Sequence, residues 1–340
     1  MKEACPVTIK DLAKKTGYGV ATVSRVLNNH PNVSEKARLS ILKAVEESGF
    51  QINENAKQLK QQRATSILVV VKGTSNEMFG SLVEAIQSRI AETDYPLVVD
   101  YIDEDSNEVL RAVTLCREKK PLGILFLGGN SEHFIADFEK IEIPCVLVSN
   151  SASGLPFKNL SSVATDDRLA AKSAVDFLIG LGHRKMVMVG GDTENSDTAK
   201  LRYEGCVDSC TEHGINFDAK KDYCGVRFSY QDGYNATKRL IEEKRDFTAL
   251  FAAADVMAIG AIRALCDCGL RVPQDVSVVG FDGLRLASFL VPKLSTVEQS
   301  VKLMAQRSVD ILLDCIENKG KSLHETVPFT VRERESTRKI

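Results

Sequence analysis

The chain of 340 residues is longer than single hydrophobic cores usually grow, so two or more domains are expected. Its apolar content of 44% and charged content of 26% are typical of a soluble globular protein, and no apolar run reaches the roughly 18 residues that span a bilayer. Nine scattered cysteines and an N-terminus without the apolar stretch of a secretory signal predict a cytoplasmic protein without a disulfide framework.

The small net charge of −2 conceals an uneven distribution. Residues 1–63 contain 11 Lys and Arg against 6 Asp and Glu, a net charge of +5. The rest of the chain holds 33 of the 44 basic residues and 40 of the 46 acidic residues, a net charge of −7. A basic N-terminal segment on an acidic body predicts a polyanionic partner for that segment, although a solvated charged surface would give the same numbers.

Three short helices are predicted over residues 7–50. Thr8 is the expected N-cap of the first helix, which ends at Gly17, and Ser34 is the expected N-cap of the third. Apolar positions at helical spacing predict one small shared core, made of Ile9, Leu12, Ala13, Val20, Val23, Val26, Leu27, Ile41, Leu42 and Val45.

A polar segment over residues 51–65 is too short to fold alone and is predicted to be a linker with helical propensity. From Ser66 onward, apolar strands alternate with amphipathic helices, which predicts parallel sheets covered by helices on both faces. The expected strands are residues 66–71, 95–102, 122–128, 143–149, 161–165, 185–191, 247–253 and 276–281. Because the pattern restarts after the loop at 151–160, we expect an α/β fold with two doubly wound parallel-sheet halves.

The three-residue turn between the first two helices is typical of a helix-turn-helix motif. Thr22, Ser24, Arg25 and Asn28 occupy outward positions of the second helix, and such side chains reach the phosphates and base edges of DNA. A plain helical hairpin within a larger bundle is the alternative. The local basic charge and the unrelated globular body that follows both weigh against it.

The segment VTIKDLAKKTGYGVATVSRVLNNHPNVSEKARLSILKAVEESGF resembles the headpiece of the LacI/GalR family of bacterial transcription regulators. The similarity continues through TDDRLAAKSAVDFLIGLGHRKMVMVGG and FAAADVMAIGAIRAL to VRERESTR. It implies a helix-turn-helix headpiece over residues 1–50, a hinge helix over 51–65 and a periplasmic-binding-protein-like core over 66–340. Within that core, the first lobe is expected to comprise residues 66–163 and 294–323, and the second 164–293 and 324–340.

The resemblance implies that the second helix lies in the major groove of a palindromic DNA operator, which a homodimer binds. In the family, operator preference depends largely on the positions filled here by Val20 and Ala21, and Leu59 matches a leucine that wedges into the minor groove. The implied DNA-binding residues are Thr8, Tyr18, Gly19, Val20, Ala21, Thr22, Ser24, Arg25, Asn28, Asn32, Ser34, Ala56 and Leu59.

Two parallel-sheet halves also predict a ligand cleft at the carboxyl ends of the strands. Asp255 and Asp282 end two strands, so their carboxylates are expected to contact ligand, and Asp255 is expected to cap a helix as well. Phe79 and Arg202 match ligand-binding positions of the family, with a core phenylalanine and a surface arginine as the alternatives. The expected effector-binding residues are Asn76, Phe79, Ser149, Asn150, Arg202, Asp255 and Asp282. The implied effector is a sugar or related metabolite, and a phosphorylated or acidic one is left open.

Two other classes of protein share such a core. A solute-binding protein of a transporter would need an export signal and no basic N-terminal segment. A cytoplasmic α/β enzyme would need catalytic motifs, and the sequence contains no P-loop, G-x-S-x-G, H-E-x-x-H or G-x-G-x-x-G motif after a strand. We therefore expect a DNA-binding repressor without enzymatic activity, cofactor or metal. A dimer is expected, and not a tetramer, because no heptad-like leucine repeat follows VRERESTRKI.

Overall fold

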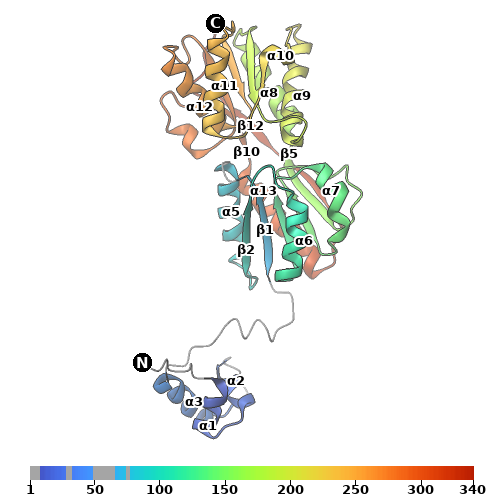
Figure 1. Ribbon diagram of the computed structural model, residues 1–340, viewed down its shortest axis with the longest axis vertical. Coiled ribbons are helices and arrows are strands. Elements are labelled where there is room, and N and C mark those ends of the chain that lie inside the picture. The colour runs from blue at the N-terminus through green and yellow to red at the C-terminus, as the bar shows by residue number, and fades with distance from the viewer. Residues whose placement is uncertain (1–7, 28–32, 49–65, 74–76) are drawn as a thin grey trace. The chain divides into compact units, whose positions relative to one another are not determined.

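The computed structural model describes residues 8–27, 33–48, 66–73 and 77–340, without the side chains of Lys10 and Ala21 (Figure 1). The chain divides into an N-terminal unit, Met1–Arg63, and a core unit, Ala64–Ile340. Each unit has a hydrophobic core of its own, as expected for a chain of this length.

The N-terminal unit contains helices α1 (Ile9–Thr16), α2 (Val20–Leu27) and α3 (Glu35–Ser48). Thr8 caps α1 through a reciprocal pair of hydrogen bonds with Asp11: the Asp11 backbone N–H donates to the Thr8 Oγ1 at 3.4 Å, and the Thr8 N–H donates to the Asp11 carboxylate at 2.9 Å. Gly17 ends the helix with a φ of 72°, a left-handed conformation that glycine adopts without strain. The predicted start and end of this helix are confirmed.

The small core of the N-terminal unit differs from the one predicted, which included two exposed residues and lacked the buried Ala37 and Ala44. The buried side chains are Leu12, Val23, Val26, Ala37, Ile41 and Ala44. The prediction was wrong for Val20 and Leu42, which are 40% and 47% exposed. In α3 the inward stripe follows positions 37, 41 and 44, and Leu42 lies about 100° further round the helix. Val20 is the first residue of α2 and is exposed, although it lies only about 60° round the helix from the buried Val23.

The first lobe of the core is a six-stranded parallel sheet with the order β11-β5-β4-β3-β1-β2. Its strands are β1 (Ile67–Lys72), β2 (Leu97–Ile102), β3 (Gly123–Leu127), β4 (Cys145–Val148), β5 (Leu160–Thr165) and β11 (His324–Val327). Its helices are α5 (Glu77–Ile90), α6 (Glu108–Lys119), α7 (Ser131–Asp137), the short η1 (Phe138–Lys140) and α13 (Val301–Glu317). Alternate residues of β1 face the two layers: Val69 packs in the cluster with α5 and α13, and Val70 in the cluster with α6 and α7.

The second lobe has the strand order β12-β10-β9-β8-β6-β7, and its β10–β12 pair is antiparallel. Its strands are β6 (Met186–Gly190), β7 (Tyr223–Gly225), β8 (Ala249–Ala252), β9 (Ser277–Asp282), β10 (Ser295–Gln299) and β12 (Phe329–Arg332). Its helices are α8 (Asp167–Gly180), α9 (Asp197–Glu212), α10 (Ala219–Asp222), α11 (Tyr230–Glu242), α12 (Asp255–Asp267) and the short η2 (Arg285–Ser288). Gly205 lets α9 approach α8 closely, because a Cβ there would lie 2.1 Å from the Arg168 carbonyl oxygen.

The chain passes between the lobes three times, after Thr165, after Gln299 and between Val327 and Phe329. Two of the expected lobe boundaries are therefore corrected. The strand at 295–299 belongs to the second lobe, although 294–323 was assigned to the first, and the strand at 324–327 belongs to the first, although 324–340 was assigned to the second. Both strands are short and mix polar with apolar residues, so their sheet partners are decided by tertiary packing.

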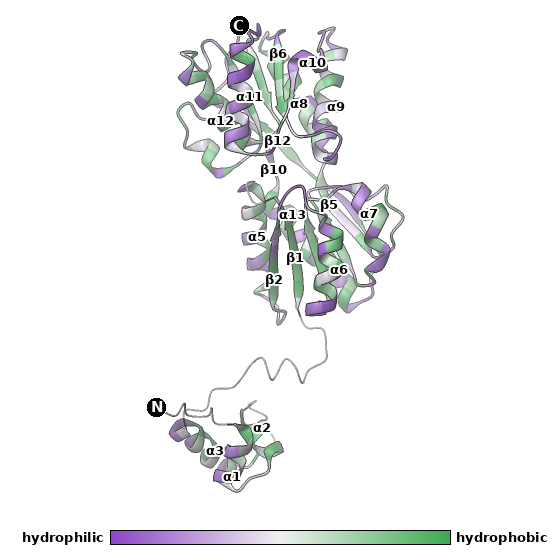
Figure 2. Ribbon diagram, viewed as in Figure 1, coloured by the Kyte–Doolittle hydropathy of each residue, from purple (hydrophilic) through white to green (hydrophobic). Residues whose placement is uncertain are grey.

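Hydropathy follows this layered arrangement (Figure 2). The strands of both sheets are predominantly hydrophobic, and hydrophilic residues gather on the helices that cover them. Among the described residues, no helix combines the length and the apolar character that a membrane span requires.

Candidate functional sites

The outer side of α2 is the first candidate site. Val23 and Val26 are buried against α1 and α3, which leaves Val20 and Arg25 exposed and Thr22 and Ser24 partly exposed. Gly19 stands before the helix, and its carbonyl oxygen accepts the N–H groups of Thr22 at 2.9 Å and Val23 at 3.1 Å. The side chains predicted to contact DNA therefore keep exposed surface outside the packed face, where a helix inserted into a major groove needs them.

Other predicted DNA-binding residues have structural positions. Thr8 caps α1, the Ser34 Oγ accepts the Ala37 N–H at 3.4 Å at the start of α3, and Tyr18 packs partly buried against the small core. The side chain of Ala21 and residues Asn28, Asn32, Ala56 and Leu59 lie outside the described residues, as does Asn76 of the predicted effector site and the whole predicted hinge over 51–65.

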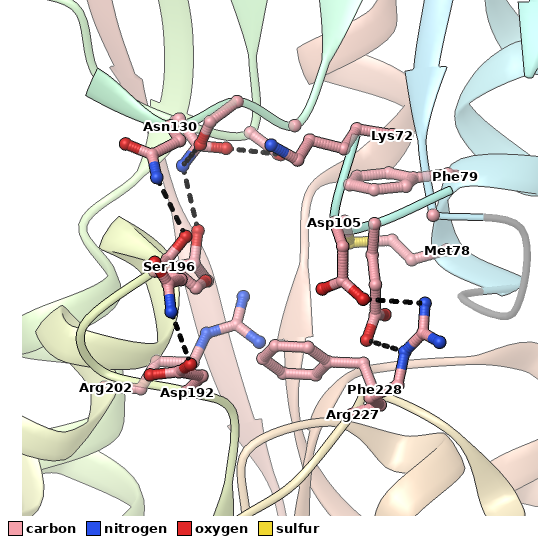
Figure 3. Close-up of a pocket in the computed structure, with 18 of the residues that line it drawn as sticks. Lys72, Met78, Phe79, Asp105, Asn130, Asp192, Ser196, Arg202, Arg227 and Phe228 are labelled. Carbon is pink, nitrogen blue, oxygen red and sulfur yellow. Dashed lines mark hydrogen bonds and ion pairs between the residues drawn. The ribbon is translucent and has the colours of Figure 1, made fainter. Parts of the chain in front are cut away.

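A cavity of about 610 Å³ lies between the two lobes of the core, within the usual range for small-molecule sites of roughly 300–1,000 Å³ (Figure 3). Its walls come from the carboxyl ends of strands, as parallel sheets dictate. Lys72 ends β1, Asn130 follows β3, Ser149 follows β4, and Asp192 follows β6. Phe228, after β7, and Phe79, in α5, add aromatic surface.

Hydrogen bonds join the two lobes along one side of the cavity. The Asn130 amide donates to the Asn195 carbonyl oxygen at 3.0 Å, and the Asn150 amide donates to the Thr198 Oγ1 at 3.0 Å. Ser131 donates its backbone N–H to the Asp197 carboxylate at 2.7 Å. Because these bonds run between residues of different lobes, they hold the lobes closed around the cavity.

A second set of contacts joins the lobes through Arg227, which follows β7. Its guanidinium lies 2.5 Å from the Glu104 carboxylate and 2.7 Å from that of Asp103, and both acids follow β2 of the first lobe. The Tyr230 hydroxyl of α11 also donates to the Glu77 carboxylate of α5. Ion pairs this exposed contribute little to overall stability, so their role is to favour the closed arrangement over an open one.

Arg202 projects from α9 into the buried wall of the second lobe. Its guanidinium donates to the Asp167 carboxylate at 2.7 Å and to the Ala253 carbonyl oxygen at 2.5 Å, and it stacks 3.7 Å from the centre of the Phe281 ring. Burial raises the pKa of Asp167, an effect that the arginine opposes. The alternative of a surface arginine is excluded, because Arg202 is 3% exposed and lines the cavity.

Asp282 lies behind Arg202 and does not line the cavity. Its Oδ1 accepts the Gln299 amide at 2.9 Å and lies 3.6 Å from the Arg202 guanidinium. Its Oδ2 is buried and has no hydrogen-bond partner among the described residues. Burial, opposed by Arg202, raises the pKa of Asp282 to about 6.

Asp255 turns away from the cavity. Its carboxylate accepts the Leu284 backbone N–H and the Thr296 hydroxyl, each at 2.6 Å, and it fits because Gly280 leaves room where a Cβ would lie 2.2 Å from its Oδ1. Burial, together with the charge of Asp282, raises its pKa to about 8. The prediction that Asp255 contacts the effector is corrected, because both of its oxygens are used inside the second lobe.

The structure thus brings Phe79, Ser149, Asn150 and Arg202 to one cavity and leaves the two predicted carboxylates outside its wall. Sequence reasoning missed the lining residues Lys72, Asn130, His133, Asp192, Arg227 and Phe228. Lys72, Asn130 and Asp192 stand at or just after the ends of strands, the same signal that selected Asp255 and Asp282. No group of three or more His, Cys, Asp or Glu side chains suited to a metal ion occurs in the described part of the chain.

Comparison with known proteins gives the same division of the chain. Residues 8–53 match the family described as bacterial regulatory proteins, lacI family, and residues 175–337 match the periplasmic binding protein-like domain. The HTH-type transcriptional regulator MalR of Clostridium butyricum is 35% identical over 97% of this chain and 99% of its own length. Catabolite control protein A of Priestia megaterium is 31% identical over 86% of this chain and 87% of its own length.

Solved structures agree with these relatives. The lac repressor dimer bound to operator and the anti-inducer ONPF is 28% identical, with a TM-score of 0.83 over 98% of this chain and 100% of the repressor chain. The lac repressor bound to ONPG in the repressed state has a TM-score of 0.82 at the same identity and coverage. These proteins are regulators of transcription and not enzymes. The chain therefore belongs to the LacI family of bacterial regulatory proteins and is a DNA-binding transcriptional regulator.

Proposed function

We propose that this regulator represses transcription as a homodimer on a palindromic operator, and that a sugar or sugar derivative in the core cavity changes its operator affinity. The observation that carries this proposal is the cavity itself, which is lined from both lobes and closed by bonds between them. A ligand that bonds to both lobes stabilises one arrangement of the lobes over others, which is the physical requirement for an allosteric switch.

In this proposal, the headpiece over residues 1–50 binds the operator, and residues 51–65 form a hinge. Arg25 and Val20 are exposed on α2, and the segment up to Arg63 is basic while the rest of the chain is acidic. One headpiece covers only a half-site, so a dimer is needed to read a palindrome. The lac repressor, which is similar over nearly the whole chain, has been solved as a dimer bound to operator.

The effector half rests on the chemistry of the cavity wall. Phe79 and Phe228 offer aromatic faces, against which the C–H faces of a sugar ring pack, and Asn130, Ser149 and Arg202 offer polar groups to its hydroxyls. Asp282 does not touch such a ligand and acts only through Arg202, whose guanidinium lies 3.6 Å from its Oδ1. The lac repressor has been solved bound to ONPG, which supports a small-molecule effector for this chain.

The experiment is a titration of the intact chain on a labelled library of palindromic sites, repeated with a panel of neutral and acidic sugars. We expect one operator sequence to be bound in steep dependence on salt, because neutralised phosphates release counterions, and one sugar to shift its affinity. A coupling of roughly 1–3 kcal/mol between the two sites is sufficient. A fragment that starts at Ser66 and binds DNA as well as the intact chain would refute the headpiece assignment. The similarity to transcriptional regulators also supports a cytoplasmic location.

A further inference from the structure

A buried carboxylate organises the cavity wall of the first lobe. Glu108, in the first turn of α6, is fully buried, and its Oε2 lies 2.6 Å from the Lys72 Nζ and 2.9 Å from the His133 Nδ1. Its Oε1 accepts the Asn130 backbone N–H at 2.7 Å. Lys72 and His133 line the cavity, and Glu108 stands behind them.

The hydrogen-bonding pattern at this wall matches a hydroxyl group. The ammonium of Lys72 has three N–H donors, of which Glu108 takes one. The His133 Nδ1 lies 2.9 Å from the Glu108 carboxylate and 3.4 Å from the Lys72 Nζ, and the tautomer that donates from Nδ1 to the nearer carboxylate leaves Nε2 as an acceptor. In that tautomer Lys72 donates and His133 accepts, and a hydroxyl does both, whereas an ionised phosphate or carboxylate oxygen can only accept.

The charges that line the cavity also favour an uncharged ligand. Among the described residues, each of the three lysines and arginines that line it has a carboxylate within 2.7 Å: Lys72 has Glu108, Arg202 has Asp167, and Arg227 has Glu104. Asp192 adds a further acid to the wall, and the Asn195 amide holds its pKa below the ordinary value. An anionic ligand would meet cations that are already neutralised and a surplus of carboxylates.

We propose that Glu108 makes the cavity selective for uncharged, hydroxyl-rich ligands, by neutralising Lys72 and orienting Lys72 and His133 as a donor–acceptor pair. This inference rests on the proposed function, since it narrows the sugar-class effector to a neutral one. Lys72 and His133 are the ligand-contacting residues of the first lobe, and Glu108 is a positioning residue.

The same carboxylate connects the ligand to lobe closure. Asn130, which donates its N–H to Glu108, also donates its side-chain amide to Asn195 of the second lobe, and the next residue, Ser131, bonds to Asp197. A ligand held by Lys72 and His133 therefore fixes the loop that carries the bonds between the lobes.

The test uses the intact chain, isothermal calorimetry and thermal melting. The probes are inorganic phosphate, the neutral sugars glucose, galactose, maltose and cellobiose, and the anionic forms glucuronate, galacturonate and glucose 6-phosphate. In the unaltered chain we expect each anionic form to bind at least tenfold more weakly than its neutral parent. Glu108→Gln keeps the shape of the side chain and leaves the Lys72 charge uncompensated. It should raise the affinity for phosphate and glucose 6-phosphate at least tenfold, and adding Lys72→Met should remove that gain.

Glu118→Gln is the matched control, because it removes the same charge from the exposed far end of α6 and should leave every affinity unchanged. Melting curves and operator binding report whether Glu108→Gln folds. If Glu108→Gln does not fold, the Lys72→Met variant tests the proposal by itself. Lys72→Met should weaken the binding of a neutral sugar and leave the weak binding of phosphate unchanged. The proposed selectivity is overturned if an anionic sugar binds the unaltered chain more tightly than the corresponding neutral sugar does. It is also overturned if Glu108→Gln leaves the affinity for phosphate unchanged. If no sugar binds while the phosphate gain appears, the role of Glu108 stands and the proposed sugar effector fails.

Discussion

Replacing Asp255 by asparagine is expected to remove a large part of the pH dependence of core stability between pH 5 and pH 9, where the unaltered core loses stability. Asp255 is fully buried, and its pKa rises from 3.8 to about 8 through burial and the charge of Asp282. Between about pH 4 and pH 8 the unfolded chain carries an ionised carboxylate while the folded core keeps it protonated. The stability that this group contributes is therefore complete below about pH 4 and is lost as the pH rises to about 8.

The size of the effect follows from the shift. Each unit of pKa is worth about 1.4 kcal/mol, so a shift of about four units costs on the order of 5 kcal/mol at pH 9 relative to pH 4. In Asp255→Asn, the amide oxygen still accepts the Leu284 N–H. The amide N–H₂ donates to the Thr296 Oγ1, whose own proton turns to the Val297 carbonyl oxygen 3.3 Å away. The substitution thus removes the charge and keeps a hydrogen bond to each of the two partners of the carboxylate.

Denaturant unfolding of the core, measured at several pH values, provides the assay. The free energies of unfolding of Asp255→Asn and of the unaltered chain should differ little at pH 5. At pH 9 the Asp255→Asn variant should be the more stable of the two. Asp275→Asn is the control, because Arg271 lowers the pKa of that surface carboxylate to about 2 and the sign is reversed. It should cost stability at every pH above about 4. A difference between Asp255→Asn and the unaltered chain that is the same at pH 5 and pH 9 would refute the reasoning, since the carboxylate would then be ionised in the folded core.

Four further outcomes are expected. Arg25→Ala should weaken operator binding by about 1–3 kcal/mol per half-site in a gel-shift or anisotropy titration, and a loss equal on random DNA would assign Arg25 to phosphate contact alone. Thr8→Ala removes the cap of α1 and should lower the thermal stability of the headpiece by about 1 kcal/mol, with the melting of the core unchanged. Arg202→Met leaves the Asp167 carboxylate buried without its cation, so it should destabilise the core by about 3–5 kcal/mol as well as abolish effector binding by calorimetry. Leu59→Ala should lower operator affinity more than random-DNA affinity and flatten the response to effector, and an equal loss on both would reduce Leu59 to a linker residue.

The headpiece and the sheets were predictable because their signals are local. The cap at Thr8, the left-handed glycine at 17 and the continuous apolar runs of β1, β3 and β6 each follow from a few neighbouring residues. The predicted lobe was wrong for strands β10 and β11, because their sequences, STVEQ and HETV, carry no preference for either sheet. The partner of β11 is β5, which lies more than a hundred residues earlier in the chain, so no local pattern indicates this pairing.

The cavity was predictable in position and only partly in composition. A carboxyl-terminal strand position indicates nearness to the cavity, but it does not decide the direction of a side chain. Asp255 begins α12 at such a position, and Gly280 on the neighbouring strand opens a space behind it, so the carboxylate turns inward. Lys72 differs from Asp255 in the opposite sense, because it lines the cavity although the sequence did not predict it there. A lysine at the end of a buried strand is normally expected to reach solvent, and only the buried Glu108, 36 residues later, holds it at the cavity wall.

The three passages between the lobes also dictate an order of folding. Strand β11 completes the first sheet and β12 completes the second, so both sheets remain unfinished until residues 324–332 have been synthesised. The headpiece needs only contacts among residues 8–48 and can fold while the ribosome is still translating the core. Each lobe must wait for long-range pairing, such as that of Ser162 with His324, and such non-local topologies fold slowly. A nascent chain that stops before residue 324 would carry a competent headpiece on two sheets that each expose an unpaired edge to aggregation.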